Sequence, residues 1–121
     1  MKYMLLIYHD EHHWNEIGDS ERQQIYSEYG KLREQLEAGG QFLGGSQLQP
    51  TTTATSIRVR DGKELVTGGP FAETHEQLGG YILIDAKDLD DAIAVAKRIP
   101  STRTGAVEVR PLVEREVQAK A

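Results

Sequence analysis

Residues 3–8 read YMLLIY, an unbroken apolar run that stops at His9 and Asp10. A strand with one face in water alternates apolar and polar residues, so a continuous run predicts a strand that is buried on both faces. Residues 81–84 read YILI and have the same character. The two runs therefore predict two strands of a sheet whose opposite faces are both covered.

Two helices are predicted from apolar residues that recur every three or four positions. The first is expected over residues 20–38, with Ser20 and Gln23 as a capping box and Gly39 as its stop. Asp88 has the residue type that caps a second helix. The predicted inner stripes are Ile25, Tyr29, Leu32 and Leu36 in the first helix, and Leu89, Ala92, Ile93, Ala96 and Ile99 in the second.

The remaining segments read as strands. Residues 42–48 form a glycine-interrupted strand, and residues 57–60 and 64–67 flank an Asp-Gly pair, which is a strong signal for a hairpin. Residues 106–110 form the last strand. The order is β-α-β, a hairpin and β-α-β, which predicts an α+β fold with a ferredoxin-like split β-α-β sheet and an inserted hairpin.

Two helices cover only one face of such a sheet, whereas the strands at 3–8 and 81–84 are apolar on both sides. A second copy of the same face, related by a two-fold axis, is the economical cover. We therefore expect a homodimer in which two sheets pack face to face. Residues 1–115 are expected to form one domain and residues 116–121 a frayed C-terminal tail.

Composition narrows the function classes. The chain has 121 residues, with 19 acidic and 14 basic side chains and a net charge of −5, which argues against nucleic-acid binding. It has no cysteine, so thiolate chemistry and cysteine-based metal sites are excluded. The apolar run at 3–8 is too short for a signal peptide or a membrane span, and a cytoplasmic protein without a membrane partner is expected. The glycine pairs form no phosphate loop, so no cofactor is predicted.

Residues 68–100 read GGPFAETHEQLGGYILIDAKDLDDAIAVAKRIP, and residues 105–112 read GAVEVRPL. These stretches resemble the DGPF (DGPFAETKE) group of YCII-related proteins, and the resemblance covers nearly the whole chain. It implies a ferredoxin-like, dimeric α/β barrel and an association with extracytoplasmic-function sigma factors, but no established reaction. Gly68 stands where the group's motif has aspartate, and His75 stands where lysine is common. The His–Asp pair suggested for the wider group does not transfer cleanly to this chain.

The loop over residues 68–80 is the first candidate site. Glu73 and His75 lie two positions apart, so they project together from an extended segment and could exchange protons with a substrate. Phe71 could anchor the loop over an apolar opening. The alternative is a plain connection in which Phe71 fills the dimer interface.

The cluster His9, Asp10, Glu11, His12 and His13 is the second candidate, because imidazole and carboxylate groups bind zinc and similar ions. On an extended chain His12 and His13 point in different directions. A solvated loop without metal is therefore the prediction, and Trp14 is expected to pack on the domain.

Arginines form the third candidate. Arg58 and Arg60 share one face of a strand, with Arg110 expected near them across the sheet, and such a cluster could hold a carboxylate or phosphate. Solvated arginines paired with glutamates are the alternative. Tyr8, Tyr29 and Tyr81 could line a cleft or pack in a core or interface.

The leading functional hypothesis is a homodimer that binds a small polar or anionic ligand in a cleft between sheet and helices, as an accessory to sigma-factor-dependent transcription. An enzyme that uses His75 and Glu73 is the first alternative. An interaction module that meets a sigma factor through its acidic surface is the second. The expected ligand-binding residues are Arg58, Arg110, Phe71, Tyr81 and Tyr8.

Overall fold

The computed structural model describes residues 1–115 and confirms the predicted order of strands and helices. Two short helices, α1 and η1, and a further 3-10 turn, η2, were absent from the expectation. The elements are β1 (Lys2–His9), α1 (Glu11–Glu16), α2 (Asp19–Ala38), β2 (Phe42–Gln47), η1 (Thr51–Thr53), β3 (Thr55–Arg60), β4 (Lys63–Gly68), β5 (Gln77–Asp85), α3 (Leu89–Ala96), η2 (Pro100–Arg103) and β6 (Ala106–Pro111).

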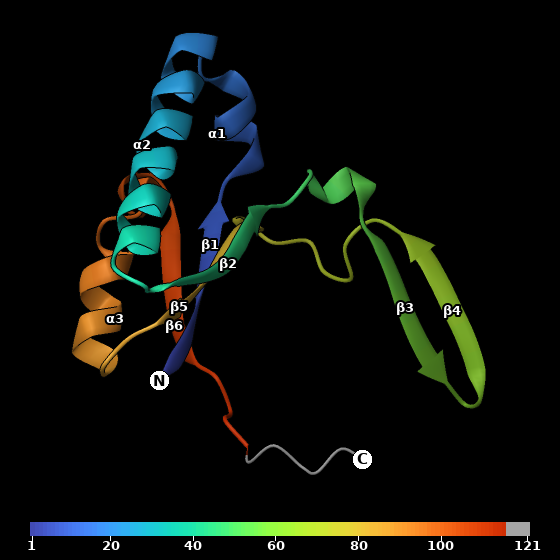
Figure 1. Ribbon diagram of the computed structural model, residues 1–121. Helices are drawn as coiled ribbons and strands as arrows, with labels where there is room; N and C mark the ends of the chain where they lie inside the picture. The colour runs from blue at the N-terminus through green and yellow to red at the C-terminus, as the bar shows by residue number, and fades with distance from the viewer. Residues whose placement is uncertain (116–121) are drawn as a thin grey trace.

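Four strands form one antiparallel sheet in the order β2-β5-β1-β6. This is the order produced when two β-α-β units interlock, so the α+β class is confirmed and the arrangement is consistent with the ferredoxin-like plan. Helices α1, α2 and α3 lie on one side of this sheet (Figure 1). Within residues 1–115, no α-helix packs against the opposite side.

The hydrophobic core lies between the sheet and the helices. Alternate residues of β1 point into it, and Leu5 is fully buried. Its partners include Ile84 from β5, Leu36 from α2, and Ile99 just after α3, each at most 1% exposed. The buried alternate residues of the strands pack here against the apolar stripes of the helices, as the sequence predicts.

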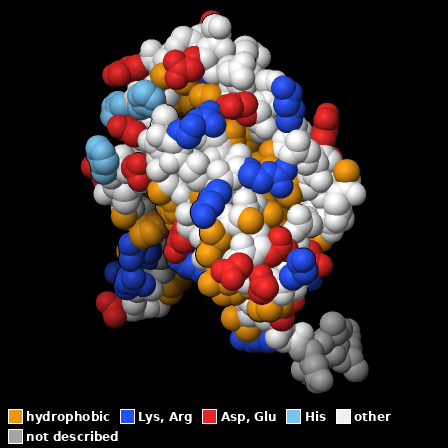
Figure 2. All heavy atoms as spheres, turned by 90° about the vertical axis from the view of Figure 1, so that its left-hand side faces the viewer, with side chains coloured by type: hydrophobic (Ala, Val, Ile, Leu, Met, Phe, Trp, Pro, Cys, Tyr) orange, Lys and Arg blue, Asp and Glu red, His pale blue; other side chains and the backbone are white. Residues whose placement is uncertain are grey.

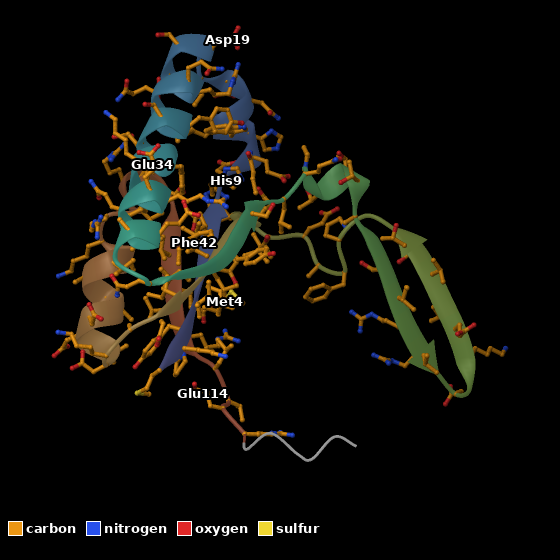
Figure 3. The ribbon with its side chains drawn as sticks, in the orientation of Figure 1. Met4, His9, Asp19, Glu34, Phe42 and Glu114 are labelled. Carbon is orange, nitrogen blue, oxygen red and sulfur yellow. The ribbon has the colours of Figure 1, made fainter. Side chains whose placement is uncertain are left out.

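The other residues of β1 face the side without helices. Met4, Leu6 and Tyr8 are half-buried, and Met4 lies on the side of the sheet that faces the hairpin (Figure 3). Their antiparallel partners on β5 include Leu83 opposite Met4. We call this surface, with Tyr81 opposite Leu6, the open sheet face.

Strands β3 and β4 form a separate two-stranded sheet that projects from the domain as an arm (Figure 1). Asp61 and Gly62 at its tip have φ angles of 53° and 76°, so both central residues are in the left-handed region that a two-residue hairpin turn requires. The predicted hairpin is thus confirmed, with β3 beginning two residues earlier than expected.

One helix start differs from the prediction and the other agrees with it. The cap of α2 is Gly18, without a side-chain hydrogen bond, and Ser20 already lies inside the helix, so the capping box was wrong. Asp88 does cap α3, because its side chain accepts a hydrogen bond from the Asp91 amide at 2.9 Å. Leu89 is half exposed and does not belong to the inner stripe.

The predicted strand at 81–84 extends over Gln77–Asp85, which shortens the preceding connection to residues 69–76. The tail predicted at 116–121 lies outside the described residues. None of the helices within residues 1–115 combines the length and the apolar character needed to cross a membrane.

A candidate ligand-binding cavity

A cavity of about 430 Å³ lies between the sheet and the helices α1 and α2, where the sequence predicted a cleft. Most of the surface that lines it is apolar, and polar and charged side chains also border it. The polar lining residues on which the site depends are His9, Glu28, Tyr29, Arg33, Ser101 and Arg103.

Glycines keep the cavity open. Gly30 lies in the middle of α2, and a Cβ at this position would meet no atom within 4 Å. Glycine inside a helix lowers helix stability by about 1 kcal/mol relative to alanine. The missing side chain of Gly30 also leaves space beside the cavity. At Gly79 on β5, a Cβ would lie 2.4 Å from His9 Nε2. The bare backbone therefore lets the His9 ring lie close against the strand.

Three aromatic side chains form a row along one wall. The His9 and Trp14 rings are 6.0 Å apart at 69°, and the Trp14 and Tyr26 rings are 5.6 Å apart at 75°. Both pairs have the edge-to-face geometry that aromatic rings prefer. His9 ends β1 (Figure 3), Trp14 lies on α1 and Tyr26 lies on α2. We call these three residues the aromatic row.

A pair of hydroxyl groups forms the most directional polar feature. Tyr29 Oη and Ser101 Oγ are 2.6 Å apart, and they join α2 to η2 across 72 residues of sequence. Burial is the main cause that raises the pKa of the Tyr29 phenol, and it outweighs the lowering effects of Ser101 and Arg103. The phenol therefore stays protonated and keeps its capacity to donate at neutral pH.

The two arginines of the lining have acidic or aromatic partners within the chain. Arg103 Nη2 lies 2.6 Å from Glu28 Oε1. The Arg33 guanidinium lies 4.6 Å from the centre of the Phe42 ring and 3.6 Å from the Glu37 carboxylate. Acidic and basic side chains are likewise interspersed over the helical side, with hydrophobic atoms between them (Figure 2). The lining thus offers no uncompensated cluster of positive charge.

The His9–His13 segment is not the predicted solvated loop. Asp10 caps α1 by accepting a hydrogen bond from the His12 amide, so the segment is helical from Glu11 onward. The Glu11 carboxylate accepts two hydrogen bonds from Thr51, from the amide at 2.9 Å and from the hydroxyl at 2.6 Å. These carboxylates are thus used for structure. Within residues 1–115, no three histidine or acidic side chains gather as a metal site would require.

The predicted proton-transfer residues lie elsewhere. Glu73 and His75 are exposed in the connection between β4 and β5 and do not border the cavity. In the described part of the chain, neither side chain makes a hydrogen bond or ion pair. Phe71 is 77% exposed, and the Arg58 guanidinium lies 5.9 Å from the centre of its ring. The structure therefore unites Phe71 with Arg58 but brings neither to the cavity.

Arg110 does not join Arg58 and Arg60, as the sequence had predicted. The hairpin forms its own sheet, whereas Arg110 lies on β6 and forms a 2.5 Å ion pair with Glu108. The hydrogen bond to this arginine lowers the pKa of the Glu108 carboxyl, and the carboxylate in turn raises the pKa of Arg110. The expected arginine cluster was therefore wrong.

The two other tyrosines belong to the open sheet face. Tyr8 donates a long hydrogen bond of 3.4 Å to Glu108. Tyr81 borders the cavity, but its register opposite Leu6 puts it on the sheet face opposite to Ile82. Of the three tyrosines considered, Tyr29 is the one that borders the cavity and whose hydroxyl group is hydrogen-bonded to another lining residue, Ser101.

The model for the YCII-related domain matches residues 1–116 of this chain. The chain belongs to the YCII-related family. An uncharacterized protein of Rhizobium meliloti (strain 1021) is 35% identical over 114 residues, which cover 93% of this chain and 92% of the relative. The recognition made from the sequence is thus confirmed at the level of the family.

Sequence reasoning about this YCII-related protein missed much of the cavity lining. Trp14 was assigned to packing, and Tyr26 and Ser101 were not considered. One signal was present, since Gly30 follows Tyr29 inside a strongly helical pattern, and a glycine in that position invites a packing or functional reason. The contacts of Trp14 and Ser101 depend on α1 and η2, and no periodic pattern in the sequence predicts these two short elements.

Proposed function

We propose that this YCII-related protein binds a small molecule in the cavity between α1, α2 and the sheet. The observation that carries the proposal is the cavity itself. Its volume of about 430 Å³ falls in the range of about 300–1,000 Å³ that is usual for ligand pockets. Mainly apolar walls with a few converging polar groups are also typical of such pockets.

A ligand screen by thermal denaturation tests this function, because binding to the folded state raises the unfolding midpoint. Gly30→Leu places a side chain beside the cavity, and Ser27→Leu introduces the same residue at an exposed position of α2 outside the lining. Compounds that raise the midpoint of the wild type should lose that effect in Gly30→Leu and keep it in Ser27→Leu. Equal responses in both variants would place binding outside the cavity.

The proposal includes a homodimer formed through the open sheet face and the arm. Ile57, Val59 and Val66 of the arm are 58–67% exposed, and a two-stranded hairpin alone in water is marginally stable. Arm and open sheet face lie on the same side of the sheet (Figure 1). A second copy supplies an apolar face of matching character.

Sedimentation equilibrium at micromolar concentration tests the dimer. Val66→Lys in the arm should shift the wild-type dimer toward monomer. Leu89→Lys is the matched control, because Leu89 is a half-exposed leucine on α3, on the helical side of the sheet. A wild-type protein that sediments as a monomer would overturn this part of the proposal.

The sequence resemblance supports two further parts of the proposal, which are membership of the DGPF group and an accessory role in sigma-factor-dependent transcription. A cytoplasmic location, which we also propose, would suit that role. The acidic net charge is the feature that would serve a sigma-factor contact. Titration of this protein with a purified extracytoplasmic-function sigma factor tests the role. Salt-dependent, stoichiometric binding is expected, and its absence at low salt would remove the sigma factor from the proposal.

The enzymatic alternative based on His75 and Glu73 receives less support. Both side chains are exposed, and neither borders the cavity. General acid–base chemistry needs the groups within hydrogen-bond reach of a bound substrate. The alternative therefore ranks below ligand binding.

A further inference from the structure

The walls of the cavity favour one shape of ligand. The aromatic row presents ring edges and ring faces at steep angles, with 69° between His9 and Trp14 and 75° between Trp14 and Tyr26. A flat ring can stack on one member and meet the edge of the next, and such contacts contribute beyond the area they bury. A saturated ring of the same size gains burial alone.

The hydroxyl pair favours one polar group. Between Tyr29 and Ser101, one hydroxyl must donate to the other, which leaves the second O–H hydrogen free. Both residues line the cavity. A ligand acceptor such as a carbonyl oxygen would satisfy this hydrogen.

The two arginines of the lining do not require an anionic ligand. Arg103 already faces Glu28 at 2.6 Å, and Arg33 lies over Phe42 with Glu37 nearby. An anion would have to compete with these carboxylates of the chain. A neutral molecule leaves both arrangements intact.

We infer that the cavity selects neutral, planar aromatic compounds of one or two rings, with a carbonyl or hydroxyl oxygen placed against Tyr29 and Ser101. The inference rests on the proposed ligand-binding function and specifies its ligand class. The cavity volume of about 430 Å³ lies near the lower end of the range for ligand pockets, which favours one or two rings.

Matched probes test the ligand class by isothermal titration calorimetry on the full chain. The probes are 2-acetylnaphthalene, its fully saturated counterpart, naphthalene without an acceptor, and the anion 2-naphthoate. We expect 2-acetylnaphthalene to bind at least tenfold more tightly than the saturated ketone, and more tightly than 2-naphthoate. Equal or tighter binding of either competitor overturns the ligand class and leaves small-molecule binding intact.

Variants test the hydroxyl anchor. Tyr29→Phe should weaken 2-acetylnaphthalene by about threefold to tenfold, the equivalent of one hydrogen bond, and should leave naphthalene unchanged. Tyr8→Phe is the matched control, because Tyr8 is a half-buried tyrosine that does not border the cavity. Ser101→Ala provides the same test if Tyr29→Phe folds poorly. Equal effects of Tyr29→Phe on both probes reject the anchor.

The two proposals fail in different ways. If no aromatic, saturated or anionic compound of a broad panel binds the wild type, the proposed small-molecule function fails as well. If compounds bind but Gly30→Leu does not weaken them, the cavity is the wrong site. The aromatic ligand class is supported when the aromatic ketone binds more tightly than its saturated counterpart, and when Gly30→Leu and Tyr29→Phe weaken that binding.

Discussion

Gly105→Ala offers a sharp test of how β1 is held at the cavity. Gly105 precedes β6, and a Cβ built on it would lie 2.1 Å from the Tyr8 carbonyl oxygen and 3.1 Å from His9 Cα. Both are backbone atoms of β1, so no side-chain rotation relieves the clash. The added methyl group would push apart two strands that pair through Tyr8 and Ala106.

The magnitude follows from these distances. An ordinary Cβ contact begins at 3.4 Å, so the strands must separate by roughly 1 Å, which belongs to the upper part of the 1–3 kcal/mol range for overpacking. We expect Gly105→Ala to lower the free energy of unfolding by about 3 kcal/mol. For a domain of this length, that is a fall in the unfolding midpoint of about 12 °C.

The control makes the same chemical change where space is free. Gly30→Ala adds a methyl group that meets no atom within 4 Å and replaces glycine inside α2, so it should stabilise the protein by about 0.5–1 kcal/mol. Both variants are compared with the wild type by urea unfolding and circular dichroism, at one protein concentration. A Gly105→Ala protein as stable as the wild type would refute the packing of η2 and β6 against β1.

Three further predictions follow from other contacts. The folded pKa of Tyr29 lies above its unfolded value of 10.0, so its contribution to stability is complete below pH 10 and is lost as the pH rises toward the folded pKa. Urea unfolding at about pH 9 and pH 11 should therefore show a larger alkaline loss for the wild type than for Tyr29→Phe, and equal losses would contradict the burial of this phenol. Asp88→Ala should cost about 1 kcal/mol of unfolding free energy because it removes the cap of α3, whereas Asp90→Ala in the same first turn should cost less; the reverse order in chemical denaturation would refute the cap. The double variant Glu73→Gln, His75→Ala should bind cavity ligands as the wild type does, because neither residue borders the cavity; a turnover that depends on these residues would favour the enzymatic alternative.

Much of the fold could be predicted because the signals are local. The apolar run at 3–8, the stripe that contains Leu32 and Leu36, and the Asp61-Gly62 turn each reflect a backbone geometry that neighbouring residues impose. One failure concerned a local signal as well. Ser20 and Gln23 match a capping box, yet Gly18 takes the cap position. The start of α2 also depends on the position of α1, which ends just before it.

The candidate site was less accessible to prediction. The sequence indicated a cleft between sheet and helices, but it assigned ligand binding to Arg58, Arg110 and Phe71, which lie outside the cavity. Arg58 and Arg110 both lie in segments that read as strands, so nothing in the sequence separates them. In the structure they lie on different sheets, because β3 and β4 form a sheet of their own.

The sequence by itself determined the α+β class, the strand and helix order, and the family, since periodicity, turn chemistry and motif similarity are properties of contiguous residues. Only the tertiary structure decided which distant groups meet. Tyr29 reaches Ser101 across 72 positions, and His9 lies on Gly79 of another strand. Such contacts depend on how α1, α2 and η2 pack on the sheet. This packing is set by the whole core, and no single segment of sequence contains it.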